Sequence, residues 1–249
     1  MALHLVFGAT LMMLPISYVG RQPGWRRRWS AGLLRALGVR LEAPPVEVEP
    51  GTLVVANHVS WLDALVLDAI CPAKFVAKDE LQRWPLLGRL LAREGTIFLR
   101  RGFNRRLPEL VGDLHARLAR GETIACFPEG TTSDGRRLLP FRAALFESAA
   151  RGGTPVAAFA LHYRDGAGRY SDAAAFIGEQ SLLESLVAIA LADGLCVRAE
   201  LRAVFAATSR RAARRAAQEA VQDGLRAGRP MATRIPSTFT PAAISTAEA

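Results

Sequence analysis

Apolar residues in this chain gather in short runs that end in polar or charged residues. Four runs have the length and composition of buried strands: residues 52–56, 95–99, 123–127 and 155–161. Residues 60–70 and 107–121 instead repeat apolar positions at helical spacing, and Gly121 ends the second segment as a C-cap would. Strands that alternate with helices predict a largely parallel sheet, whose ligands bind at the carboxyl ends of the strands.

The polar residues after these predicted strands are therefore the first candidates for a binding or catalytic site. We expect the following side chains along one edge of the sheet: His58, Arg100, Arg101, Glu129 and His162. Further along the chain, residues 196–207 predict a late strand, and residues 209–228 predict a basic helix capped by Thr208 or Ser209. The arginines of that helix either face solvent or contact a membrane.

The N-terminal segment differs from the rest of the chain because residues 2–20 contain no Asp, Glu, Lys or Arg. That length is close to the roughly 20 residues that span a bilayer, and the Arg and Trp residues of 21–29 would lie at the headgroups. No positive charge precedes the segment, which argues against a cleaved signal peptide. The segment predicts a membrane anchor that spans or dips into the bilayer, with a buried soluble helix as the alternative.

The domain organisation predicted from these patterns has three parts. Residues 1–43 form an anchor followed by an interfacial helix at 29–41, residues 44–207 form the α/β domain, and residues 208–249 form a basic helix and a disordered tail. The predicted fold class is thus α/β, a mixed and largely parallel sheet flanked by helices, on an N-terminal helical membrane anchor. If the anchor spans a cell inner membrane, the positive-inside rule places everything after Arg21 in the cytoplasm.

Composition narrows the class of protein and its partners. Hydrophobic residues make up 50% of the 249 residues, which excludes an intrinsically disordered chain. The three cysteines are far apart, which argues against a disulfide framework and against a zinc site, and fits a reducing compartment. The net charge of +9 attracts polyanions, such as nucleic acid, anionic lipid headgroups or an acidic carrier protein.

The stretch NHVSWLD, residues 57–63, places a histidine and an aspartate between two apolar runs. Ser60 and Asp63 match the S-x-x-D pattern of a capping box at a helix N-terminus, which explains the aspartate without catalysis. His58 lies outside that cap, and a histidine held by a carboxylate is suited to general-base chemistry. No G-x-S-x-G motif or catalytic-cysteine signature accompanies it, so such a base would activate a hydroxyl group of the substrate.

Four stretches in order resemble the four sequence blocks of the glycerolipid acyltransferase family, which includes the 1-acyl-glycerol-3-phosphate acyltransferases. They are NHVSWLD, GTIFLRRG, FPEGTTSDG and TPVAAFALHY, and the likeness runs from about residue 25 to residue 205. The resemblance implies that His58 is the base and that Asp63 orients it. It also implies a set of acceptor-binding residues: Arg100, Arg101, Glu129, Gly130 and Thr131. Pro128 would shape the turn.

The resemblance further implies a membrane-bound O-acyltransferase that moves a fatty acyl group from acyl-carrier protein or acyl-CoA to the free hydroxyl of a lysolipid. It implies neither a metal nor a cofactor. Phosphatidate-forming members usually read F-P-E-G-T-R-S, whereas this chain has Thr132 in place of that arginine. Enzymes that acylate lyso-ornithine lipid often share this departure, so that phosphate-free acceptor is the alternative to 1-acyl-glycerol-3-phosphate.

Two other classes of function remain compatible with the sequence. A non-catalytic basic protein that binds a membrane surface or nucleic acid would also be rich in arginine, although no nucleic-acid-binding module is recognisable, and we expect no nucleic acid partner. A thioester hydrolase would use water in place of the acceptor hydroxyl. The interpretation that we favour is the acyltransferase, with membrane lipids, the lysolipid and the acyl carrier as partners.

Overall fold

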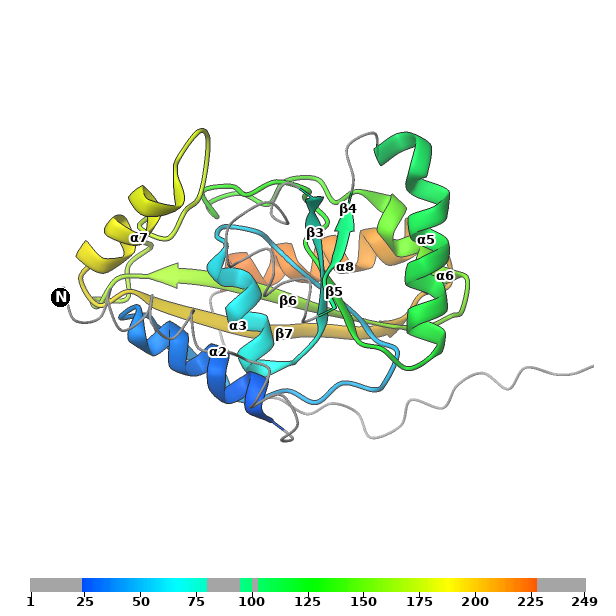
Figure 1. Ribbon diagram of the computed structural model, residues 1–249, viewed down its shortest axis with the longest axis horizontal. Coiled ribbons are helices and arrows are strands. Elements are labelled where there is room, and N and C mark those ends of the chain that lie inside the picture. Colours follow the sequence, from blue (N-terminus) through cyan, green and yellow to red (C-terminus); the bar gives the residue numbers. More distant parts are fainter. Residues whose placement is uncertain (1–23, 80–94, 100–102, 228–249) are drawn as a thin grey trace, which may run out of the picture.

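The computed structural model describes residues 24–79, 95–99 and 103–227. These residues build one sheet of seven strands in the order β1-β7-β6-β2-β5-β3-β4 (Figure 1). The strands are β1 Arg40–Glu42, β2 Leu53–Ala56, β3 Lys74–Lys78, β4 Ile97–Leu99, β5 Ile124–Cys126, β6 Pro155–Arg164 and β7 Cys196–Ala206. The helices are α2 Trp25–Ala36, α3 Leu62–Ile70, α5 Phe103–Ala119, α6 Phe146–Ala150, α7 Leu182–Leu191 and α8 Arg210–Ala227, with a 3₁₀ turn η3 at Ala143–Leu145.

The sheet is mixed and largely parallel, as predicted. β6 and β7 form a long antiparallel pair, whereas every other neighbouring pair is parallel. The sequence analysis missed β1 and β3, because β1 is only three residues long and β3 begins and ends with a lysine. Neither strand therefore contains the continuous apolar run by which the central strands were found.

Helices cover both faces of the sheet, and the two faces have separate apolar cores. The core on one face joins side chains of α2, α3 and α7, for example Leu33, Leu67 and Ile189. The core on the other face joins side chains of α5, α6 and α8. All four residues of β2 are buried, two toward each core, which explains why that strand reads as an uninterrupted apolar run.

The helix at 25–36 packs on the folded domain through one side, and it overlaps the stretch 29–41 where an interfacial helix is predicted. Leu33 and Leu34 are fully buried. Ser30 donates a hydrogen bond to Asp68 of α3 over 2.8 Å, and Arg26 forms an ion pair with the same carboxylate. The apolar spacing that suggested an interfacial helix therefore reflects packing of α2 on α3.

The boundary predicted at residue 43 does not separate two bodies, since β1 pairs with β7 in the main sheet. Similarly, α8 packs on β6 and β7 through the buried side chains of Ala213, Ala217 and Val221, so residues 210–227 belong to the same core. Across residues 24–79, 95–99 and 103–227, no helix combines the length and apolarity needed to cross a membrane. The anchor predicted at 2–20 and the tail at 229–249 lie outside the described residues.

Candidate active site

The loop after β2 is held in place by the side chain of Asn57. Its amide nitrogen donates to the Leu161 carbonyl over 3.0 Å, and its amide oxygen accepts from the Leu161 N–H over 2.7 Å. This reciprocal pair extends the contact between β2 and β6 by one residue beyond the strand. The position of the His58 backbone at the carboxyl edge of the sheet is therefore fixed. The alternation of strands and helices predicted this location.

His58 and Asp63 form a hydrogen-bonded pair. The Nδ1 atom of His58 lies 2.9 Å from Oδ2 of Asp63, whose carboxylate is fully buried, whereas the histidine side chain is 21% exposed. The same Oδ2 atom accepts the backbone N–H groups of Val59 and Ser60 over 2.7 and 2.9 Å. Asp63 thus accepts the Ser60 N–H just before α3, as the S-x-x-D spacing predicted, and it also contacts the histidine ring.

The second oxygen of Asp63 has its own partner in Tyr163 of β6. The buried Tyr163 hydroxyl donates to Oδ1 of Asp63 over 2.6 Å. Burial raises the pKa of this phenol, and the adjacent carboxylate raises it further, so Tyr163 stays protonated and keeps its donor. Asp63 therefore accepts hydrogen bonds on both oxygens, which compensates for the desolvation of a buried carboxylate and fixes its orientation.

The turn after β5 holds the backbone of His58 from the other side. The His58 N–H donates to Oε1 of Glu129 over 2.6 Å, and the Ser133 N–H donates to the His58 carbonyl over 2.9 Å. The other oxygen of Glu129 accepts the Leu139 N–H over 2.8 Å. Burial raises the pKa of Glu129 to about 7, although the two backbone N–H donors oppose that rise. Both oxygens of Glu129 are thus occupied by backbone donors.

The imidazole of His58 is also fixed by an aromatic contact. Its ring stacks on Phe127 with centroids 4.1 Å apart and planes 7° apart, and Phe127 stacks in turn near Phe75. The ring therefore has one face packed and Nδ1 directed at Asp63. When Nδ1 is protonated and donates a hydrogen bond to Asp63, Nε2 is the nitrogen that can accept a proton from a bound molecule.

No nucleophile accompanies this histidine. In the part of the chain that the structure describes, no serine or cysteine side chain donates a hydrogen bond to the His58 ring. Cys126 ends the neighbouring strand, but burial raises the pKa of its thiol to about 12, so it remains a protonated apolar group. The arrangement is thus a histidine held by a buried carboxylate, without a serine or cysteine partner among the described residues.

Comparison with known proteins agrees with this geometry. Residues 40–162 match a family model described as Acyltransferase, a segment that includes β2, α3, the Glu129 turn and most of β6. Residues 40–162, just under half of this chain, thus match the acyltransferase family.

Proteins similar to this chain are named for two different acceptors. The chain is 44% identical to a 1-acyl-sn-glycerol-3-phosphate acyltransferase of Neisseria meningitidis over 140 residues, which are 55% of either chain. It is 40% identical to a lyso-ornithine lipid O-acyltransferase of Pseudomonas aeruginosa over 168 residues, which are 64% of this chain and 61% of the relative. The chain thus spans between half and two thirds of the length of these curated relatives.

The fold of the acyltransferase domain has a solved counterpart. The crystal structure of the 1-acyl-sn-glycerophosphate acyltransferase of Thermotoga maritima matches with a TM-score of 0.57. The match covers 88% of this chain and 86% of that chain at 20% identity. The likeness supports the mixed α/β architecture flanked by helices.

The predicted acceptor-binding residues of the acyltransferase domain are only partly placed. Arg100 and Arg101 lie outside the described residues. Gly130 has φ 73° and Thr131 is exposed, both on the turn next to Glu129. His162 belongs to the opposite face of β6 from Tyr163, where burial and nearby arginines lower its pKa to about 4. His162 therefore lies within β6 without joining the His58 pair.

Three residues of this domain were not identified from sequence: Tyr163, Phe127 and Arg142. The guanidinium of Arg142 packs against the Gly130 backbone, so closely that an added Cβ on Gly130 would lie 2.9 Å from its Nε and Cζ atoms. Tyr163 could have been found, because Phe159, Leu161 and Tyr163 alternate along β6 and must share one face. Phe127 and Arg142 have no sequence signal of this kind, because their contacts depend on how loops close over the sheet edge.

Proposed function

We propose that this protein is a membrane-bound O-acyltransferase that moves a fatty acyl group from a thioester to the free hydroxyl of a lysolipid. The observation that carries the proposal is the His58 and Asp63 pair, which has a partly exposed imidazole and, among residues 24–79, 95–99 and 103–227, no serine or cysteine hydrogen-bonded to its ring. Direct attack by an acceptor hydroxyl needs a base of this kind. Covalent catalysis through an acyl-enzyme would instead need a serine or cysteine within hydrogen-bond reach of that base.

In the proposed reaction, Nε2 of His58 removes the proton of the acceptor hydroxyl as its oxygen attacks the thioester carbonyl. Asp63 stabilises the imidazolium that forms, since its Oδ2 atom already accepts from Nδ1. The tetrahedral intermediate then collapses with cleavage of the carbon–sulfur bond, and the imidazolium returns its proton to the departing thiolate. The products are an ester of the lysolipid and the free thiol of the carrier.

The acceptor that we favour is 1-acyl-glycerol-3-phosphate, which would yield phosphatidate. The relative at 44% identity bears that activity in its name, and a cationic side chain adjoins the Glu129 turn. Arg142 contacts Gly130 there, and Arg100 and Arg101 are proposed to bind the acceptor phosphate together with Thr131. Because both oxygens of Glu129 accept backbone N–H groups, we propose that it holds the backbone of His58 in place, without a direct bond to the acceptor.

A lyso-ornithine lipid is the second candidate acceptor, and Thr132 favours it. The Thr132 hydroxyl donates to the carbonyl of Phe176, so this position serves to tie two loops together and supplies no charge. Loss of an arginine there removes a charge-assisted bond to phosphate, worth about 1.5 to 3 kcal/mol. The relative at 40% identity is named for that acceptor.

We propose that residues 2–20 anchor the protein in the cell inner membrane, with the catalytic domain facing the cytoplasm. The support is the uncharged character and length of that segment. Either proposed donor, acyl-carrier protein or acyl-CoA, is acidic, which suits the net charge of +9.

One assay tests the proposed function and separates its alternatives. Full-length protein is incubated with radiolabelled acyl-carrier protein or acyl-CoA and, separately, with 1-acyl-glycerol-3-phosphate, lyso-ornithine lipid or no acceptor. Chromatography should show a labelled two-chain lipid with one acceptor and none without it. Release of free fatty acid in every tube would identify a thioester hydrolase. Absence of turnover combined with salt-sensitive binding to DNA would support the non-catalytic basic protein.

A further inference from the structure

Helix α7 presents an apolar stripe to solvent. Leu183, Val187 and Leu191 recur every four residues and are 70%, 42% and 64% exposed. Such spacing places all three on one side of the helix. Ile177, in the loop before the helix, is a further 49% exposed aliphatic residue. In Figure 1, α7 stands at one end of the sheet, away from α5 and α6.

The opposite side of α7 packs on the loop that carries His58. Ser185 and Ile189 are buried, and the Ser185 hydroxyl accepts a hydrogen bond from the Trp61 indole over 3.0 Å. The segment before the helix is joined to the same loop, since the Phe176 N–H donates to the Val59 carbonyl over 2.9 Å. A surface that binds the exposed stripe is therefore separated from the loop that carries His58 only by α7 itself.

The chemistry around the stripe favours a lipid surface over a second copy of the chain. The net charge of +9 repels an identical molecule and attracts an anionic leaflet. Arg40 and Arg169 are exposed near the end of α7, where their backbone segments hydrogen-bond to Leu195 and Asp193. Each is paired with a carboxylate, Glu42 and Asp165 respectively, so the attraction to an anionic surface rests mainly on the net charge of the chain. Glu184 is the acidic residue within α7, and its carboxylate is engaged by the Ser181 N–H and hydroxyl in a capping box.

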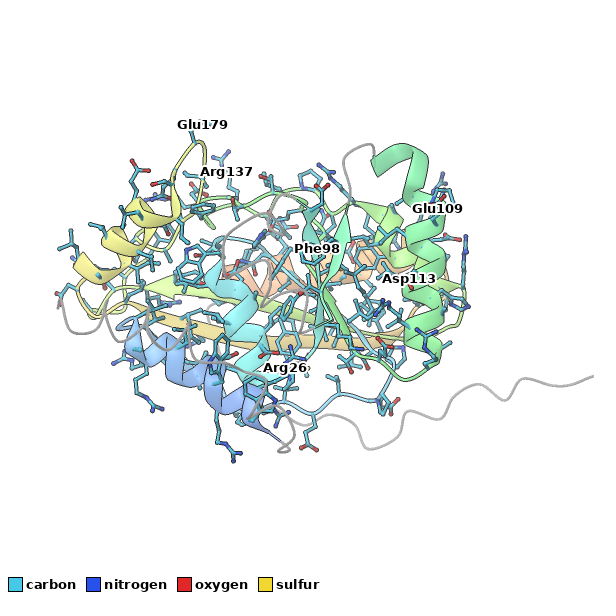
Figure 2. The ribbon with its side chains drawn as sticks, in the orientation of Figure 1. Arg26, Phe98, Glu109, Asp113, Arg137 and Glu179 are labelled. Atoms are coloured by element: carbon cyan, nitrogen blue, oxygen red, sulfur yellow. The ribbon has the colours of Figure 1, made fainter. Side chains whose placement is uncertain are left out.

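The position of α7 relative to the expected anchor also favours a lipid surface. α2, which follows residues 1–23, and α7 contribute to the core on the same face of the sheet. A membrane segment that leads into α2 would therefore bring this face toward the bilayer. Glu179 lies at the outer tip of the loop before α7 (Figure 2).

We propose that the α7 stripe, Leu183, Val187 and Leu191, docks into the interface of an anionic lipid bilayer and so presents the His58 loop to its acceptor. This inference rests on the proposed function, because a lysolipid acceptor resides in that interface. Burial of apolar side chains at the headgroup boundary together with attraction to anionic lipid is the usual basis of such docking.

The test places a fluorophore on the stripe of the full-length protein. Cys71, Cys126 and Cys196 are buried, so a cysteine added by Leu183→Cys or Leu191→Cys can be labelled selectively with an environment-sensitive dye. Val204→Cys is the matched control, since Val204 is an exposed aliphatic residue near the far end of β7 from α7. Vesicles of phosphatidylcholine with and without phosphatidylglycerol are then added, with a second set that carries a quencher on the acyl chains.

Docking predicts a blue shift at positions 183 and 191 on addition of anionic vesicles, quenching by the labelled acyl chains, and neither change at 204. An unchanged spectrum at 183 and 191 would overturn the proposal, and so would an equal shift at 204. A blue shift that grows with protein concentration in the absence of vesicles would identify a second copy as the occupant instead. The fluorescence needs no turnover, so a failed acyltransfer assay and a failed docking test are distinguishable.

Discussion

Two buried carboxylates lie on opposite sides of His58, and they hold different parts of it. Asp63, at the start of α3, contacts the imidazole and also accepts a hydroxyl and two backbone N–H groups. Glu129, in the turn after β5, accepts two backbone N–H groups, one of them from His58 itself. One carboxylate thus fixes the ring, and the other fixes the chain that carries the ring.

The difference teaches which carboxylate can respond to chemistry at the histidine. A proton gained by the His58 ring changes its charge 2.9 Å from Asp63 Oδ2 and strengthens that bond. Glu129 contacts the backbone of His58, whose charge does not change. We therefore expect substitutions around Asp63 to affect mainly turnover, and substitutions of Glu129 to affect mainly stability and its dependence on pH.

The largest effect should come from the histidine that both carboxylates hold. His58→Gln removes the base and should lower turnover about 10² to 10⁴-fold, the range usual for loss of a general base. Steady-state acyltransfer at saturating acceptor measures the effect. His115→Gln, a change of the same type on α5, is the matched control and should retain activity. Normal turnover of folded His58→Gln protein would remove this residue from the mechanism.

The next effect concerns Glu129 and the pH dependence of stability. Its pKa is about 7 in the folded protein, compared with 4.5 for an ordinary glutamate. The folded state then binds the proton more tightly, so the contribution of this group to stability is greatest below pH 4.5 and is lost as the pH rises through 7. That difference in pKa corresponds to about 3 kcal/mol.

Glu129→Gln removes the titrating carboxyl group. Urea unfolding from pH 4.5 to 8 measures the effect on the free energy of unfolding. The free energy of unfolding of the wild type, minus that of the variant, should fall by about 3 kcal/mol across this range. Glu109→Gln, on the outer side of α5 (Figure 2), is the matched control at an exposed position. A difference between wild type and Glu129→Gln that stays constant with pH would show that the Glu129 carboxyl does not titrate in this interval.

A smaller effect should follow from Tyr163→Phe. This variant tests the separate roles of the two carboxylates, because it removes a hydrogen bond to Asp63 and leaves the hydrogen bonds of His58 in place. The variant leaves Oδ1 of the buried carboxylate without its hydroxyl donor, which costs about 1.5 to 3 kcal/mol for a bond to a charged group. We expect kcat to fall about tenfold with KM unchanged, since the tyrosine positions the dyad. Tyr170→Phe is the control, because that hydroxyl bonds a loop carbonyl and its side chain is 38% exposed. An increase in KM with normal kcat would contradict the positioning role.

The sequence predicted those parts of the fold and site that local patterns determine. The central strands are buried on both faces and therefore appear as apolar runs, and the polar residues that follow β2 and β5 mark the edge where His58 and Glu129 meet. The S-x-x-D spacing likewise predicted that Asp63 would reach back to the Ser60 N–H. Each of these features depends on residues a few positions apart.

Features set by distant parts of the chain were not predictable in the same way. The apolar spacing of residues 29–41 fits a membrane interface and a protein core equally well, and only the contact with α3 decides that Leu33 and Leu34 are buried in the protein. The bond from Tyr163 to Asp63 joins residues 100 positions apart. The backbone role of Glu129 depends on how the turn after β5 folds over the loop after β2.

The most direct test of the His58 and Asp63 dyad is a paired measurement of melting temperature and turnover on Asp63→Asn. Asparagine keeps the shape of the side chain and an oxygen for the Val59 and Ser60 N–H groups, and its amide nitrogen can donate to the Tyr163 oxygen. Folding should therefore be largely preserved, whereas loss of the charge that stabilises protonated His58 should lower turnover by orders of magnitude, though by no more than loss of His58 itself. Near-normal turnover at a near-normal melting temperature would contradict the account and leave Asp63 as a helix cap alone.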